Sequence, residues 1–297
     1  QAKRNNNEHY QMYLSRVKYD PNGSIEGISQ PFRISPEGTW NSCGDFSPDA
    51  NTLIFSSTAG KQTPDVPATG PSYQWLFPEG AEIFRADGWQ GAVSALAPGG
   101  DVNLAQHPLT NNDFYDAENA FSPDGQWIIF TSNRSGDLEI WAMRSDGKDP
   151  VQLTHAPGYD GGPFFSPDAR RIVFRGDRQN NRLLQIFVAD LIFGSGGKIV
   201  GATNEQQLTH DASVNWCPFW HPDGKHLIWS TSRHGFANFE LYLMRADGTH
   251  KTRITFSSGA DILPVFSPDG NYVMWSAKRD GKTVQIYLAK FHMPHGA

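Results

Sequence analysis

The sequence predicts an all-β protein made of repeated four-stranded antiparallel sheets. One motif recurs along the chain, Gly and Pro are frequent at its turns, and aromatic strands follow each turn. The motif reads FSPDG in its fullest form, and the first aromatic residues of its copies are Phe46, Phe121, Phe165, Trp220 and Phe266. The two shortest spacings between copies are 44 and 46 residues. Four strands in such a period are the signature of a β-propeller blade.

Each copy divides into four predicted strands. A short strand precedes the SPDG turn, where Pro fixes φ and Gly or Asp tolerates the turn geometry. An alternating stretch such as WIIFTS follows, then a polar loop and a third strand such as LEIWAMR, which ends in an Asp-Gly hairpin signal. The stretch VQLT completes the unit as the fourth strand.

The repeats predict one propeller domain over residues 1–297. The start of the chain, QAKRNNNEHYQMYLSR, aligns with SAKRDGKTVQIYLAK near its end, so the first unit supplies only two outer strands. We expect six blades with an incomplete first blade, and the alternative is five blades with the N-terminal segment attached to the last. The expected units cover approximately residues 1–35, 36–110, 111–154, 155–209, 210–255 and 256–291.

Composition excludes several classes of protein. A formal net charge of -6 argues against a nucleic-acid partner, and no apolar run is long enough to span a membrane. The first residues lack the apolar stretch of a signal peptide, so any export signal would have been removed. Cys43 and Cys217 occupy equivalent places in two units that are far apart in a six-bladed ring, and we expect both thiols to be free. No motif predicts a metal site or a cofactor.

The FSPDG repeats, the EIW…DG hairpins and the QLTH strands resemble the TolB-type β-propeller repeat, which also occurs in propellers of the prolyl-oligopeptidase and tricorn-protease groups. The resemblance covers nearly the whole chain and implies a periplasmic or extracellular propeller with protein partners. It is specific for the fold and weak for function. A complete serine peptidase of this kind needs a GxSxG motif, and the sequence has none.

A carboxylate or carboxamide side chain recurs where each inner strand is expected to start. Asn41, Asp116, Asp160, Asn215 and Asp261 precede the aromatic residues of the motif by five positions. Four residues after the aromatic residue of the second strand stand Arg134, Arg178, Arg233 and Arg279, with Arg4 in the same position of the partial first unit. These groups predict either a ring of ligands around the channel or, as we favour, pairs between the Asp of one blade and the Arg of its neighbour.

Residues that differ between units are better candidates for binding. Aromatic residues lie at several inner-strand entrances, and histidines follow outer strands or lie in one loop, where they could bind a sugar or a peptide end. Packing between blades is the simpler explanation for the aromatic residues, and a solvated loop position is the simpler one for each histidine. A long insertion from Gly60 to Gly80 adds further aromatic residues. The candidate binding residues are Trp40, Tyr73, Trp75, Tyr115, Asp116, His155, Tyr159, Asp160, His210, Trp216, Arg233, His234 and Asp261.

The leading hypothesis from sequence is a non-catalytic binding or scaffold propeller of the bacterial envelope or the secreted space, which contacts a protein through the face that carries the insertion. The alternative is a carbohydrate-active enzyme similar to a polysaccharide lyase, which would bind an acidic oligosaccharide and use Tyr115, Tyr159, His155, His210 and Arg233. A third hypothesis is an accessory propeller of a peptidase whose hydrolase part is a separate chain.

Overall fold

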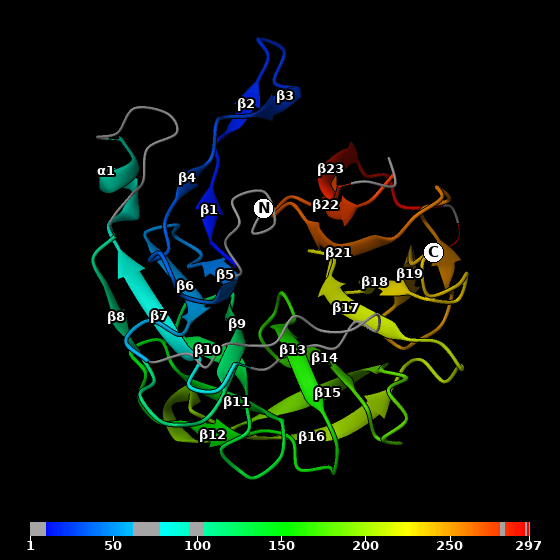
Figure 1. Cartoon of the computed structure of the whole chain (residues 1–297). Coiled ribbons are helices and arrows are strands. Elements are labelled where there is room, and N and C mark those ends of the chain that lie inside the picture. The colour runs from blue at the N-terminus through cyan, green and yellow to red at the C-terminus, as the bar shows by residue number, and fades with distance from the viewer. Residues whose placement is uncertain (1–9, 62–77, 95–103, 280–282, 295, 297) are drawn as a thin grey trace. The chain divides into compact units, whose positions relative to one another are not determined.

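The structure is a computed structural model that describes residues 10–61, 78–94, 104–279, 283–294 and 296 (Figure 1). The chain divides into two compact units. The first comprises Gln1–Ala120 and Ser132–Arg134, and the second comprises Phe121–Thr131 and Ser135–Ala297. Each unit is described separately below.

The first unit begins with two small antiparallel ladders. Strand β1 (Tyr13–Leu14) pairs with β4 (Phe32–Arg33), and between them β2 (Val17–Tyr19) pairs with β3 (Ile25–Ile28). A four-stranded sheet follows in chain order, made of β5 (Asn41–Phe46), β6 (Thr52–Ser57), β7 (Glu82–Asp87) and β8 (Gln106–Pro108). The short helix α1 (Trp89–Ser94) lies between β7 and β8 in the chain.

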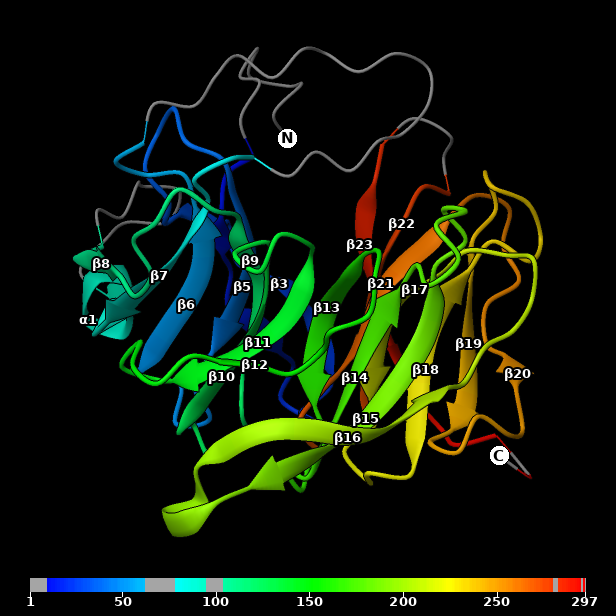
Figure 2. The ribbon, with the colours of Figure 1, turned by 90° about the horizontal axis from the view of Figure 1, so that it is seen from below.

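A second four-stranded sheet contains β9 (Asp116–Phe121), β10 (Trp127–Ser132), β11 (Glu139–Arg144) and β12 (Val151–Gln152). The division between the units passes through it, since most of β9 belongs to the first unit. The same order recurs in β13 (Asp160–Phe165), β14 (Arg171–Gly176), β15 (Gln185–Phe193) and β16 (Ile199–Gln207). The 3₁₀ turn Ser195–Gly197 joins β15 to β16, and Figure 2 shows these two long strands extending together as a hairpin.

The remaining sheets belong entirely to the second unit. One consists of β17 (Asn215–Trp220), β18 (His226–Thr231), β19 (Glu240–Arg245) and β20 (Thr252–Arg253). The last consists of β21 (Asp261–Phe266), β22 (Tyr272–Ala277) and β23 (Gln285–Lys290), and it has three strands among the described residues.

The sheets confirm the all-β propeller architecture with four-stranded antiparallel blades, and they correct the expected blade number. The part of the chain that the structure describes forms five blade sheets, whereas six were expected and five was the alternative. The described residues before the first FSPDG copy form the β1–β4 and β2–β3 ladders and add no further four-stranded sheet. A blade sheet needs inner strands, and those strands flank the motif itself.

A left-handed residue interrupts every inner strand at its third position. The φ angles are 55° at Cys43, 56° at Glu118, 58° at Gly162, 52° at Cys217 and 58° at Leu263. The register of the inner pair shifts at this point in four of the sheets. Such β-bulges bend a strand and increase its twist, so the repeat encodes the same local bend in each blade.

Buried apolar side chains pack one blade sheet of the second unit against the next. Ile186, Val188 and Leu208 pack with Trp229, Tyr242 and Met244 of the following sheet. Leu241 and Leu243 pack in turn with Phe266, Val273 and Trp275. At these two interfaces the third strand of one sheet is therefore covered on one face by strands of the next sheet.

Gly162 predicts a specific steric requirement at one bulge. A Cβ atom on Gly162 would lie 1.7 Å from Nη1 of Arg175, although the equivalent residues Cys43, Cys217 and Leu263 carry a Cβ at similar φ. We expect Gly162→Ala to lower the free energy of unfolding by about 1–3 kcal/mol because the buried guanidinium must move.

Arg175 faces Gly161 in the β13–β14 register, and Ser230 is its counterpart opposite Trp216 in the next sheet. The double variant Gly162→Ala, Arg175→Ser should therefore lose less stability than the two single losses added together. Urea denaturation measures the free energy of unfolding of the original protein, the two single variants and the double variant. Strict additivity would show that the clash is not the cause.

Candidate functional site

A threonine after each outer strand fixes the neighbouring third strand. Its Oγ1 accepts the N–H of that strand's second residue, at 3.0 Å for Thr110, 2.8 Å for Thr154 and 2.9 Å for both Thr209 and Thr255. Thr154 and Thr255 also donate to Glu139 and Glu240, each at 2.6 Å. The repeated Glu and Thr positions hold the loops at this end of the sheets. Sequence reasoning missed them, although they recur in the aligned units.

The Asp–Arg pairs form within a sheet and not between neighbouring blades, which corrects the favoured expectation. Asp116 accepts from Arg134 at 2.5 Å, Asp160 from Arg178 at 2.6 Å and Asp261 from Arg279 at 3.5 Å. In each case the arginine follows the second strand of the sheet that the aspartate begins. All three carboxylates are buried, so they stabilise the strand ends and are unsuited to a ring of exposed ligands.

Burial changes the acidity of the carboxyl groups in the second unit. It raises the pKa of Asp160 to about 8, against the opposing attraction of Arg178. Burial likewise raises the pKa of Glu139, which accepts the hydroxyl of Thr154. The negative charge of Glu139 raises the pKa of Asp160 further, whereas a hydrogen bond between the two side chains lowers the pKa of Glu139. We infer that this buried pair holds a proton near neutral pH.

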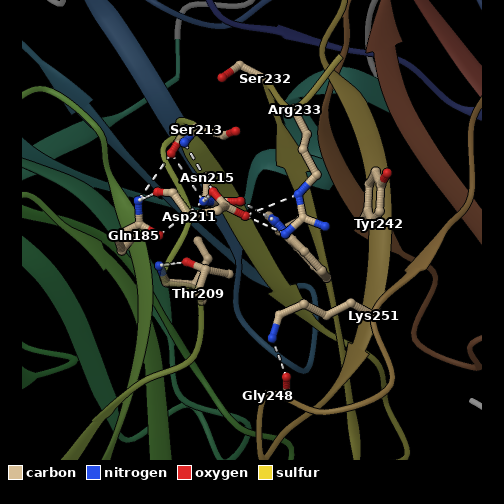
Figure 3. A network of polar contacts seen from close by, with 12 residues as sticks. Gln185, Thr209, Asp211, Ser213, Asn215, Ser232, Arg233, Tyr242, Gly248 and Lys251 are labelled. Carbon is tan, nitrogen blue, oxygen red and sulfur yellow. Dashed lines mark hydrogen bonds and ion pairs between the residues drawn. The ribbon is translucent and has the colours of Figure 1, made fainter. Parts of the chain in front are cut away.

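The β17–β20 sheet departs from the repeat. Its inner strand starts with Asn215, and Arg233 pairs with Asp211 in the preceding loop (Figure 3). The Asn215 amide donates to Asp211 at 2.9 Å and to Gln185 at 3.2 Å, while the indole of Trp229 donates to Asn215 Oδ1 at 2.9 Å. Burial alone would raise the pKa of Asp211, but hydrogen bonds from Arg233 and Asn215 hold it below its ordinary value.

Arg233, His234, Tyr242 and Lys251 continue this network. The Arg233 guanidinium lies 5.5 Å from the centroid of the Tyr242 ring, and His234 Nε2 lies 2.7 Å from the Tyr242 hydroxyl. Burial and the positive charge of Arg233 lower the pKa of Lys251, which donates to the carbonyl of Gly248. Figure 3 shows Arg233 directed toward Asp211, with Tyr242 of β19 and Lys251, which directly precedes β20, nearby. The arrangement places cationic and aromatic groups close together.

Two strongly exposed phenylalanines belong to loops of the same sheet. Phe236 and Phe256 are each 71% exposed. Asn238 connects their loops, since it accepts the Gly259 N–H at 2.9 Å and lies 3.3 Å from Glu240. Arg253 lies 4.6 Å from the Phe256 ring centroid. Exposed aromatic residues beside arginine are typical of protein-binding surfaces. We call Asp211, Arg233, His234, Phe236 and Phe256 the β17–β20 rim.

The structure brings only part of the predicted site together. In the second unit Arg233 and His234 belong to the rim, His155 and His210 are exposed, and Asp160 and Asp261 are buried. The rings of Tyr159 and Trp216 both face Arg175, at 5.4 and 5.9 Å from its guanidinium carbon.

In the first unit Trp40 packs with Tyr10 at 5.2 Å, and Tyr115 and Asp116 are buried. Tyr73 and Trp75, with most of the predicted insertion, lie outside the described residues.

The sequence did not predict five residues of this network and rim, which are Asp211, Phe236, Tyr242, Lys251 and Phe256. A signal for two of them exists in the repeats: Phe256 stands where two other units have His155 and His210, and Asp211 follows His210 directly. A comparison of the units at each position would therefore have pointed to Phe256 and Asp211.

The described residues contain no group of three or more His, Cys, Asp or Glu side chains that could hold a metal ion. Cys43 and Cys217 are not joined in a disulfide. In the same described part of the chain, no helix has the length and apolar character needed to cross a membrane.

Repeated antiparallel blade sheets with a shared inner bulge define the protein as a β-propeller. The chain belongs to the TolB beta propeller domain family, whose model matches residues 104–206 and 198–295. An uncharacterized protein of Agrobacterium fabrum is 28% identical over 122 residues, which are 41% of this chain and 42% of that protein. The match thus spans less than half of the relative's length.

Solved structures show the same fold. A protein provisionally assigned as TolB from Agrobacterium tumefaciens has a TM-score of 0.63 at 20% identity, covering 88% of this chain and 80% of that one. TolB from Acinetobacter baumannii has a TM-score of 0.63 at 19% identity, covering 94% and 61%. Oligogalacturonate lyase from Vibrio parahaemolyticus has a TM-score of 0.54 at 12% identity, covering 94% and 74%. At these identities the likeness concerns the fold alone.

Proposed function

We propose that this chain is a non-catalytic binding propeller of the bacterial cell envelope or the secreted space, and that it binds a protein partner through the β17–β20 rim. The observation that carries the proposal is the exposure of Phe236 and Phe256 on two loops that Asn238 ties together. Two phenylalanine rings exposed to water do not stabilise the fold through hydrophobic burial. A partner that covers them removes apolar surface from water, and this makes the free energy of binding more favourable.

The polar part of the rim supplies specificity. Arg233 and Asp211 already satisfy one another, so their geometry is fixed before a partner arrives. Preorganised side chains lose less conformational entropy on binding than mobile ones. We propose that a partner lays an apolar side chain on Phe236 and Phe256 and an acidic group near Arg233 and His234.

Affinity capture from an envelope extract of the source bacterium tests the proposal. The double variant Phe236→Ser, Phe256→Ser should lose the captured protein at least tenfold, because each exposed aromatic anchor contributes on the order of 1–2 kcal/mol to binding. Phe193→Ser on β15 is the matched control, since Phe193 is also an exposed phenylalanine of the second unit. Equal capture by all three proteins would refute the rim as the binding surface.

An oligosaccharide-cleaving activity has weaker support. Of the residues suspected for it, Tyr115 is 3% exposed, and Tyr159 packs on Arg175. A general acid or base must reach the proton it transfers, which a buried phenol does not do.

A further inference from the structure

Two neighbouring blade sheets of the second unit carry different charges at the same positions of the repeat. In the β13–β16 sheet the guanidinium of Arg178 bonds two carboxylates, Asp160 at 2.6 Å and Glu205 at 2.7 Å. It also lies 4.9 Å from the centroid of the Phe187 ring. Acidic residues of the same sheet therefore compensate the charge of this arginine.

In the β17–β20 sheet both acids are replaced. Asn215 begins the inner strand, as Asp160 does in the preceding sheet. Lys251 stands three positions before the apolar residue that ends the outer strand, as Glu205 does. The equivalent arginine, Arg233, therefore has an amide and an ammonium group at the two positions that hold carboxylates in the β13–β16 sheet.

Asp211 compensates only one of these two positive charges. Its carboxylate accepts hydrogen bonds from Nε and Nη2 of Arg233, whose Nη1 makes no hydrogen bond within the described residues. Lys251 donates to the Gly248 carbonyl, and no ion pair joins it to a carboxylate in the part of the chain that the structure describes. One guanidinium edge and one ammonium group therefore remain for a further acceptor.

The surroundings of Lys251 disfavour its positive charge. Its side chain is half-buried, and burial followed by the charge of Arg233 lowers its pKa. The attraction of Asp211 and Asp247 opposes this lowering without overcoming it, and the charge of Arg245 acts in turn on Asp247. A partly desolvated cation beside another cation attracts an anion more strongly than a lysine surrounded by water does.

Figure 3 shows the side chains of Arg233 and Lys251 extending into the same region, beside Tyr242 and Asp211. The Arg233 side chain is 37% exposed, so a ligand can reach it from solvent. We propose that Arg233 and Lys251 together bind an oxyanion of the carboxylate or phosphate class. Both side chains form charge-assisted hydrogen bonds with such groups. The inference rests on the proposed function only where the oxyanion belongs to a protein partner.

Competitive acetylation of lysines in the full chain tests the site without a partner. Trace acetic anhydride reacts with the neutral amine, so an anion bound to Lys251 slows acetylation there by raising its pKa and by covering it. At fixed pH and constant ionic strength, millimolar glutarate or inorganic phosphate should slow acetylation of Lys251 several-fold. Lys225, an exposed lysine in the turn between β17 and β18, should react as before. Mass spectrometry measures both lysines in one sample.

Two variants show whether Arg233 shares the ligand. Arg233→Gln should remove most of the protection that the anion gives to Lys251, and Asp211 keeps its hydrogen bond from Asn215 at 2.9 Å in this variant. Arg170→Gln, at an exposed arginine of the preceding sheet, should leave the protection unchanged. The proposal is overturned if neither anion slows acetylation of Lys251, if the control lysine slows equally, or if Arg233→Gln retains full protection.

Capture from the envelope extract distinguishes the two sources of the oxyanion. Lys251→Glu restores the acid that Glu205 supplies in the preceding sheet, so Arg233 can pair within its own sheet. If the oxyanion is a carboxylate of the protein partner, Lys251→Glu captures that protein several-fold less than the original chain, and Lys225→Glu captures it equally well. Unchanged capture by Lys251→Glu, with phosphate still protecting Lys251 in the original chain, identifies a free inorganic anion as the ligand.

The two kinds of measurement also separate this inference from the proposed function. Capture that does not depend on Phe236 and Phe256 refutes the rim as a protein-binding surface and leaves the acetylation result standing. Acetylation of Lys251 that no anion slows overturns the oxyanion site and leaves capture through the two phenylalanines standing.

Discussion

Replacing Trp229 with alanine is expected to lower the free energy of unfolding by about 3–5 kcal/mol. Trp229 is fully buried and lies in the cluster between the β13–β16 and β17–β20 sheets. Its removal creates a cavity there and also withdraws the indole N–H from Asn215 Oδ1, which lies 2.9 Å away. Chemical denaturation followed by far-UV circular dichroism measures the loss.

Trp141→Ala is the control for this variant, since Trp141 on β11 is only half-buried and its removal opens less enclosed space. Trp229→Phe separates the two contributions, because it retains most of the apolar contact while removing the indole donor. We expect Trp229→Phe to lose about 1–3 kcal/mol, the cost of leaving a buried acceptor without its partner. Equal losses for Trp229→Ala and Trp141→Ala would contradict the packing described for this interface.

The second large effect concerns pH. The pKa of Asp160 rises from 3.8 to about 8 in the folded state, chiefly through burial. The folded protein therefore retains a proton that the unfolded chain releases above about pH 4, and this contribution to stability falls as the pH rises toward 8. One such proton changes the unfolding free energy by up to about 1.4 kcal/mol per pH unit. In Asp160→Asn the unfolding free energy should change less with pH between 4 and 8.

The amide of Asp160→Asn has a precedent in this chain, because Asn215 begins the next blade sheet. Arg178 would keep Glu205 as its partner at 2.7 Å. Asp211→Asn is the control with the opposite sign: the pKa of Asp211 lies below 3.8, so its contribution is present above that pH and is lost as the pH falls. Denaturation measured from pH 3 to 9 distinguishes the two variants. If the unfolding free energy of Asp160→Asn changes with pH as steeply as that of the original protein, another group binds the proton.

The repeated residues made most of the fold predictable. Proline and glycine in FSPDG specify tight turns locally, and alternation in WIIFTS specifies a strand, so the strands follow from neighbouring residues alone. The expected number of six blades was wrong, because QMYLSR resembles the third strand of a complete unit. The structure shows that it forms only the β1–β4 ladder.

The site was predicted less completely. Arg233 was identified because it stands in a repeat position and His234 because it lies in a loop, whereas Phe236 in the same loop was not predicted. The pairing of aspartate with arginine was expected, but its location was assigned to the wrong pair of strands. A spacing of 18 residues between Asp160 and Arg178 does not reveal that the β13–β14 hairpin returns one to the other.

The sequence by itself determined the turns, the strand order within each blade and the membership of the β-propeller class, because these depend on local residue preferences repeated at a regular period. Only the tertiary structure decided which charges are buried, that Arg233 turns to Asp211 in the loop before Asn215, and that Ile286 and Leu288 stay exposed while Leu241 and Leu243 are covered. The physical reason is that burial and pairing depend on which sheet packs against which, and identical repeat positions acquire different surroundings when one sheet has a neighbour that another lacks.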